Sequence, residues 1–171
     1  MQIDLQGELK QTRPFRSPLE EAFVGLQRTA AVLEHALETA LKPSGITATQ
    51  YNVLRILRGA AETGLCRSEI GERMVRRVPD VTRLLDRLEE TGLIARARGG
   101  EDRRYVTTRI TRNGLTTLDS LDGVVTTYLE SSMGRLAPEQ LRRLNDMLAV
   151  LRHADTQDTP RRSAPDDAPV P

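Results

Sequence analysis

The chain has few of the residues that several protein classes require. Cysteine occurs once, at Cys66, and histidine twice, at His35 and His153, among 171 residues. A single cysteine excludes an internal disulfide framework, and with two histidines it cannot make an ordinary structural zinc site. We therefore expect a protein without disulfides, bound metal or cofactor.

Long apolar runs and aromatic residues are also scarce. No stretch approaches the ~18 apolar residues of a membrane span, and residues 1–10 lack the basic-then-apolar order of a signal peptide. We expect a cytoplasmic protein with no membrane partner. Because 38% of the residues are hydrophobic but only 3% are aromatic, the core must consist of Leu, Val, Ile and Ala. The chain is long enough for one such core plus an assembly surface.

Groups typical of enzyme active sites are missing from the pattern. No Ser/His/Asp set, carboxylate pair in an apolar setting, metal-ligand cluster or phosphate-binding glycine loop stands out. The Gly99-Gly100 pair is too short for a phosphate loop and lies in a predicted hairpin rather than before a helix. We predict that the protein is not an enzyme.

Arginine, by contrast, is concentrated in one segment. Residues 66–112 contain 12 arginines and 8 acidic residues, a net charge of +4, whereas the rest of the chain carries −3. This separation is expected where one face meets a polyanion and the remainder keeps the protein soluble. On charge alone, a solvated surface explains the segment about as well.

The same segment has the pattern of a helix-turn-helix. Residues 66–74 predict a short helix with Ile70 and Met74 facing inward, residues 75–78 predict a turn, and Pro79 fits the first position of a second helix. The buried stripe of that second helix would be Val81, Leu84, Leu85 and Leu88.

The outward face of the second helix carries the residues of interest. Arg83 and Arg87 lie four positions apart on one side, a like-charge pairing that costs an isolated helix a few tenths of a kcal/mol and that a nearby anion would reverse. Asp80 and Thr82 lie in the first turn, where a recognition helix points side chains at base edges.

A structural interpretation of this face stays open. Asp80 would then complement the helix dipole, and the arginines would pair with Asp86 or Glu90 of the same helix.

A two-stranded wing is predicted after the second helix. Thr91-Gly92 ends the helix, residues 93–98 and 104–110 alternate as strands, and residues 99–102 have turn chemistry. An arginine at such a loop tip suits the narrow, negative minor groove of DNA. The loop by itself is more commonly an ordinary hairpin turn, but the preceding helix pair favours a wing. The predicted fold is therefore mainly α with a small β-wing.

Long helices are predicted on both sides of this module. Ser17-Pro18-Leu19-Glu20 is a helix start with a capping box, Lys42 to Gly45 end that helix, and Thr47 to Gln50 form a second capping box. The three long apolar stripes are Leu19, Phe23, Leu26, Ala30, Leu33, Leu37 and Leu41; Leu115, Leu118, Leu121, Val125, Tyr128 and Leu129; and, after Pro138, Leu141, Leu144, Leu148 and Leu151.

The order and spacing of several short runs resemble the MarR family of bacterial transcription regulators. These runs are residues 81–89, Gly92-Leu93-Ile94, residues 101–104 and residues 111–114, and Asp102-x-Arg104 is the most specific of them. The resemblance implies a winged helix-turn-helix with long N- and C-terminal dimerisation helices. Its parts would be an N-terminal extension (1–16), a dimerisation helix (17–45), the DNA-binding lobe (46–112), C-terminal dimerisation helices (113–154) and a disordered tail (155–171). The tail consists largely of Thr, Asp, Pro and Ala, which cannot bury enough apolar surface to fold.

The resemblance also implies roles for individual residues. Arg104 would enter the minor groove, Asp102 would brace an arginine of the same module, and Arg87 would contact phosphate. The full set expected to bind double-stranded DNA is Arg76, Arg77, Pro79, Asp80, Thr82, Arg83, Arg87, Asp102, Arg103 and Arg104.

In MarR-like proteins the first and last helices of two chains interdigitate, which implies a homodimer on a pseudo-palindromic operator with half-sites roughly 34–36 Å apart. The residues expected at the dimer interface are Leu19, Phe23, Leu26, Leu141, Leu144 and Leu148. A monomer with its termini packed on its own core is the alternative, although exposed leucine stripes of this length would be a solubility liability.

The family commonly responds to a small aromatic or phenolic effector, but the pattern does not identify ligand-binding residues. Some members sense oxidants with a cysteine in the first helix, and this chain has none there. Cys66 fits a small buried or capping residue better than a thiol activated by Arg67 and Arg73, and His35 fits an interfacial hydrogen bond better than a ligand contact. We predict a ligand-responsive repressor; a winged-helix module that binds proteins instead of DNA is the alternative.

Overall fold

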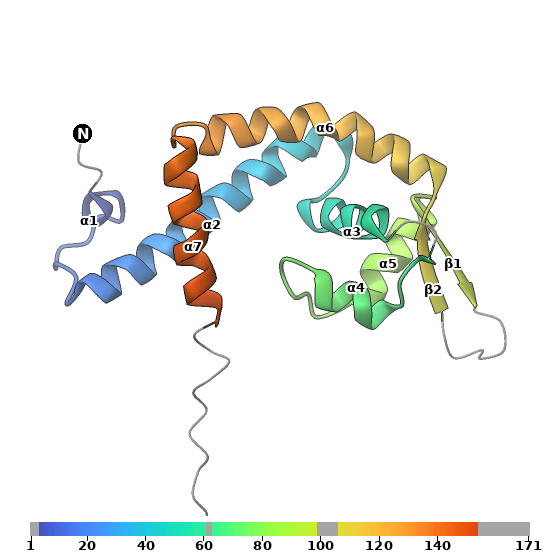
Figure 1. Ribbon diagram of the computed structural model, residues 1–171, viewed down its shortest axis with the longest axis horizontal. Coiled ribbons are helices and arrows are strands. Elements are labelled where there is room, and N and C mark those ends of the chain that lie inside the picture. The colour runs from blue at the N-terminus through green and yellow to red at the C-terminus, as the bar shows by residue number, and fades with distance from the viewer. Residues whose placement is uncertain (1–3, 61–62, 99–105, 154–171) are drawn as a thin grey trace, which may run out of the picture. The chain divides into compact units, whose positions relative to one another are not determined.

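The computed structural model describes residues 4–60, 63–98 and 106–153, and the chain divides into two compact units, residues 1–132 and 133–171. The elements in chain order are α1 (Leu5–Glu8), α2 (Pro18–Leu41), the 3-10 helix η1 (Lys42–Ser44), α3 (Ala48–Gly59), α4 (Arg67–Arg73), α5 (Val81–Glu90), β1 (Ile94–Arg98), β2 (Val106–Ile110), α6 (Arg112–Met133) and α7 (Pro138–His153) (Figure 1). The predicted fold class, mainly helical with a two-stranded wing and long terminal helices, is confirmed.

Helix α2 begins as its sequence predicts, with one difference. The Ser17 hydroxyl accepts a hydrogen bond from the Glu20 backbone N–H at 3.2 Å, and Pro18 is the first helical residue. The Glu20 carboxylate, however, accepts from the backbone N–H and the guanidinium of Arg16, at 2.7 and 3.1 Å. A neighbouring cation thus attracts the carboxylate that the expected capping box would have used.

Helix α3 has the complete capping box that the sequence predicts. The Gln50 backbone N–H donates to the Thr47 hydroxyl at 3.1 Å, and the Thr47 N–H donates to the Gln50 side-chain oxygen at 2.9 Å. Satisfying two otherwise unpaired donors fixes the direction in which α3 leaves η1. Its inner face carries the buried residues Tyr51, Val53, Leu54 and Leu57.

Helices α3, α4 and α5 lie together beside the wing strands β1 and β2 (Figure 1), and these five elements are called the lobe. Ile70 of α4 is fully buried and Met74 is 7% exposed, as predicted. Leu41 at the end of α2 and Leu118 and Leu121 of α6 complete the lobe's core from outside it. The core residues are Leu41, Ile46, Tyr51, Val53, Leu54, Leu57, Leu65, Ile70, Met74, Leu85, Leu88, Leu93, Ile94, Leu118 and Leu121.

The second helix of the helix-turn-helix starts later than predicted. Pro79 was expected at its first position, but the helix begins at Val81 and Asp80 is the capping residue. The Asp80 carboxylate accepts from the Arg83 backbone N–H at 2.9 Å. Because a carboxylate satisfies an unpaired helical N–H and complements the positive end of the dipole, Asp80 sets the start and Pro79 precedes it.

Gly92 ends α5 as predicted. Its φ of 71° lies in the left-handed region, which favours glycine. Its N–H donates to the Glu89 carbonyl at 2.8 Å, and the Leu93 N–H donates to the Leu88 carbonyl at 3.0 Å. This is the Schellman arrangement, which turns the chain directly into the wing.

The wing strands pair antiparallel, from Ile94 opposite Ile110 to Arg98 opposite Val106. A third segment, not predicted, extends this sheet: Leu65 and Thr108 exchange two backbone hydrogen bonds at 3.0 and 2.8 Å. The preceding Gly64 has a φ of 65°, and a Cβ there would lie 2.7 Å from the Thr108 carbonyl oxygen. Glycine is therefore needed where the chain passes the wing.

Helix α6 connects the wing to α2. Gly114, near its start, approaches the Leu93 carbonyl so closely that a Cβ would lie 2.1 Å from that oxygen. Further along, the Tyr128 hydroxyl donates to the Leu33 carbonyl of α2 at 2.9 Å. These contacts attach the lobe to the long helices within the first unit.

Helix α7, in the second unit, begins at Pro138 as predicted. None of its residues is buried. Leu141, Leu144 and Leu148 are half-buried, while Val150 and Leu151 are 71% and 60% exposed. No helix in the described ranges is both long and apolar enough to cross a membrane.

Candidate nucleic-acid interface

Helix α5 presents two different faces. Leu85 and Leu88 are almost completely buried, which fixes the orientation of the helix in the lobe. The opposite face is exposed and carries Thr82, Arg83 and Arg87. Core packing therefore holds two guanidinium groups and a hydroxyl on the outer surface, as the sequence predicts.

Neither Arg83 nor Arg87 forms an ion pair within the part of the chain that the structure describes. Asp86, one of the partners considered for them, instead pairs with Arg96 of β1 at 2.7 Å. Asp80 thus caps the helix, as the structural interpretation of this face expected, whereas the arginines do not pair with Asp86.

Arg96 joins the wing to α5. Its backbone N–H donates to Glu89 Oε1 at 3.0 Å, and its Nε donates to Glu89 Oε2 at 2.7 Å. The side-chain hydrogen bonds with Arg96 lower the pKa of Glu89, and those with Glu89 raise the pKa of Arg96. The sequence pattern did not single out Arg96, although its place just after Gly92-Leu93-Ile94 put it within reach of the end of α5.

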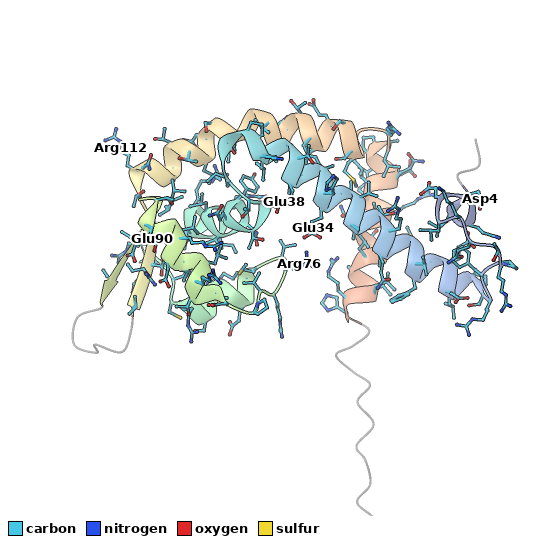
Figure 2. The ribbon with its side chains drawn as sticks, turned by 180° about the vertical axis from the view of Figure 1, so that it is seen from behind. Asp4, Glu34, Glu38, Arg76, Glu90 and Arg112 are labelled. Carbon is cyan, nitrogen blue, oxygen red and sulfur yellow. The ribbon has the colours of Figure 1, made fainter. Side chains whose placement is uncertain are left out.

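Arg76 has an intramolecular partner that the sequence did not suggest. Its guanidinium forms a short ion pair with Glu34 of α2, and Figure 2 shows the two side chains pointing toward each other. The backbone of the preceding residue is also held, since the Val75 N–H donates to Asn52 Oδ1 at 3.0 Å. The turn between α4 and α5 is thereby attached to α2 and α3, and a DNA contact by Arg76 stays a prediction.

The remaining predicted site residues divide into two groups. Arg77 and Pro79 are exposed in the turn before α5. Asp102, Arg103 and Arg104 lie outside the described residues, between the paired strand positions Arg98 and Val106. Their roles at the tip of the wing stay predictions.

A cavity of about 430 Å³ lies between α2, α3, α6 and the turn before α5. Its wall is mainly apolar and includes two aromatic rings, Tyr51 and Tyr128, with Arg55 and the Glu34–Arg76 pair as its charged groups. The guanidinium of Arg55 lies 5.8 Å from the centre of the Tyr51 ring. Such a cavity can accept a small planar molecule with a polar group.

Cys66 and His35 have ordinary structural settings. Cys66 is the half-buried capping residue of α4, and its backbone N–H donates to the Glu69 carboxylate at 2.7 Å. That hydrogen bond lowers the pKa of Glu69. His35 is exposed on α2. No group of metal-binding side chains occurs in residues 4–60, 63–98 and 106–153.

Comparison with known proteins decides the family. The MarR family model matches residues 46–106, which run from the start of the lobe into the wing. The chain is 30% identical over 131 residues to the HTH-type transcriptional repressor IacR of Pseudomonas putida, with 77% of each chain covered. The chain belongs to the MarR family. As a member of the MarR family it is a DNA-binding transcriptional regulator and not an enzyme.

Two solved MarR-like structures show the same fold. A cysteine-to-serine mutant of MarR from E. coli, complexed with operator DNA, is 23% identical with a TM-score of 0.69, over 87% of this chain and 99% of that one. BpsR of Bordetella bronchiseptica, whose DNA binding is regulated by 6-hydroxynicotinic acid, is 21% identical with a TM-score of 0.72, over 84% and 100%.

Proposed function

We propose that this MarR-family chain is a sequence-specific repressor that binds a pseudo-palindromic operator as a homodimer and is released by a small ligand. The observation that carries the proposal is the outer face of α5, where Arg83 and Arg87 are exposed and unpaired among the described residues. Unpaired guanidinium groups on a helix held by its opposite face suit phosphate and base edges in a major groove. That the relative IacR is a repressor supports the direction of control.

The apolar surface of α2 supports the homodimer. Leu19, Phe23 and Leu26 are 83%, 60% and 43% exposed along one stripe. An apolar stripe of this length is the pattern of an interface rather than of a solvated helix. A second copy of the chain would cover the stripe and place two copies of α5 on successive turns of one DNA face, about 34–36 Å apart.

The cavity beside the Glu34–Arg76 pair supports an effector. Two tyrosine rings suit an aromatic or phenolic molecule, and Arg55 suits an anionic group on it. A ligand in this position contacts both α2 and the turn before α5, so it can favour one placement of the lobe over another. It weakens DNA binding by the difference between its affinities for the two placements.

The test is selection of genomic DNA fragments by the purified protein, followed by gel shifts of selected fragments at two salt concentrations. A repressor of the proposed kind selects fragments that share an inverted repeat, and its affinity falls steeply with salt. Sedimentation of the same sample gives the mass of the free protein. The absence of any selected fragment at low ionic strength would favour the alternative, a winged-helix module that binds proteins.

A further inference from the structure

Helix α5, the proposed recognition helix, has acidic residues close to its exposed arginines. Asp86 lies three positions after Arg83, and Glu90 lies three positions after Arg87. Side chains three apart are adjacent on a helix surface, so α5 could pair its arginines internally. An arginine paired with a carboxylate of its own helix neutralises less phosphate charge, and the affinity for DNA falls accordingly.

In the structure, a cation from outside the helix holds two of the acidic groups of α5. Arg96 Nη2 lies 2.7 Å from Asp86 Oδ1 and 2.5 Å from Glu89 Oε2. The Arg96 side chain is only 25% exposed, and the hydrogen bond from its backbone N–H holds Glu89 from a second direction. A planar guanidinium can bridge two carboxylates in this way because its donors point in several fixed directions.

We propose that Arg96 is a positioning residue for DNA recognition, which holds Asp86 and Glu89 against the wing and thereby keeps Asp86 from pairing with Arg83, so that Arg83 is free to meet DNA. The inference rests on the proposed function, because it assigns Arg96 a part in operator binding without contact to the operator. It follows that replacing Arg96 should lower the affinity for DNA only while Asp86 and Glu89 carry charge.

A double-mutant cycle tests this consequence with four full-length proteins: wild type, Arg96→Gln, Asp86→Asn with Glu89→Gln, and all three changes together. The ligand is one DNA fragment selected by the wild type, titrated at several salt concentrations. We expect Arg96→Gln to weaken binding on the order of tenfold and to flatten the salt dependence. The two neutral substitutions should change wild-type binding little but restore most of the affinity in the Arg96→Gln background.

A matched control is Arg58→Gln. Arg58 of α3 also pairs with two carboxylates, those of Asp119 at 3.6 Å and Asp122 at 3.8 Å, away from α5. The same change of residue there should leave affinity for the fragment within about twofold of the wild type. A loss as large as that of Arg96→Gln would show a general effect on the lobe and would overturn the inference.

Three further outcomes would overturn the inference. If Arg96→Gln binds as tightly as the wild type, or if the neutral substitutions have the same effect in both backgrounds, Arg96 does not act through these carboxylates. If the wild type itself selects no DNA, the proposed function fails together with this inference.

Should Arg96→Gln not fold by circular dichroism, Arg96→Lys replaces it, because an ammonium keeps the charge but cannot bridge both groups in a plane. A smaller loss, again removed by the two neutral substitutions, would then support the inference.

Discussion

The lobe and the N-terminal half of α2 differ in how they satisfy their apolar residues. In the lobe, Leu54 and Leu88 are fully buried, and the helices around them are capped and packed. In α2, Leu19 is 83% exposed, although the helix is equally regular. The difference indicates that the lobe is stabilised by a closed core, to which the end of α2 and α6 contribute, whereas the first half of α2 has an apolar face that the described residues of the first unit leave exposed.

The largest expected effect is on the free energy of unfolding, which should respond differently to substitutions in the two regions. Leu54→Ala should lower the free energy of unfolding by about 2–5 kcal/mol, because it leaves a cavity in the core. Leu19→Ala should act only through association, so its effect should depend on protein concentration. Denaturant unfolding at two protein concentrations measures both, and equal, concentration-independent losses would contradict the comparison.

The next effect concerns association alone. Phe23→Asp, at a side chain that is 60% exposed, should weaken the dimer by at least about 2 kcal/mol, since it places a charge in an apolar interface. Sedimentation should then show single subunits while the helical signal in circular dichroism is unchanged. Arg28→Asp, exposed near the opposite side of the same helix, should leave the dimer intact. Dissociation by both variants would contradict the proposed interface.

On the lobe's side of the comparison, Arg104→Ala should reduce affinity for DNA by about 1–3 kcal/mol and lower the salt dependence. The expected reason is loss of the arginine that enters the minor groove. Gel shifts of a selected fragment over a salt series measure both quantities. Binding that is unchanged across the series would remove the wing from the mechanism.

The smallest expected effect is a pH dependence inside the lobe. The side-chain hydrogen bond with Arg96 lowers the pKa of Glu89. A lowered carboxyl pKa contributes stability that is present above the pKa of the unfolded chain, about 4.3 for glutamate, and that is lost as pH falls through the folded value. The destabilisation caused by Glu89→Gln should therefore shrink as unfolding is measured at progressively more acidic pH below that point.

Glu90→Gln is the control for this pH series, because Glu90 forms no ion pair within the described ranges. Its effect on the free energy of unfolding should vary less with pH than that of Glu89→Gln. If the effect of Glu89→Gln on the free energy of unfolding is the same at neutral pH and at pH values well below the pKa of an ordinary glutamate, Arg96 does not stabilise the lobe through this carboxylate.

Most features that depend on neighbouring residues were predictable from the sequence, although the capping box expected at Ser17 and Glu20 is incomplete. The capping box of Thr47 and Gln50 and the end of α5 at Gly92 formed as expected, because each is a local competition for backbone hydrogen bonds. The start of α5 was misplaced by two residues for the same kind of reason. Pro79 and Asp80 are both good starting signals, and only the hydrogen bond to Arg83 shows that Asp80 prevailed.

Features that join distant segments were not predictable. The Leu65–Thr108 pairing adds a segment to the wing, and nothing in either residue type points to the other. The candidate site was similarly incomplete: its exposed arginines followed from helical periodicity, but the partners of Arg76 and Arg96 did not. The wing residues Asp102 and Arg104 stay predictions that rest on the family resemblance.

The sequence by itself determined where most helices begin and end, which face of α5 is apolar, and that arginines occupy the other face. These properties follow from spacing and from hydrogen bonds between near neighbours. Only the tertiary structure decided which arginines are engaged within the protein and which are left outside it. Arg76 pairs with Glu34, 42 positions away in the chain, and Asp86 pairs with Arg96 rather than with Arg83 of its own helix. An ion pair depends on the distance between packed elements and not on position in the sequence.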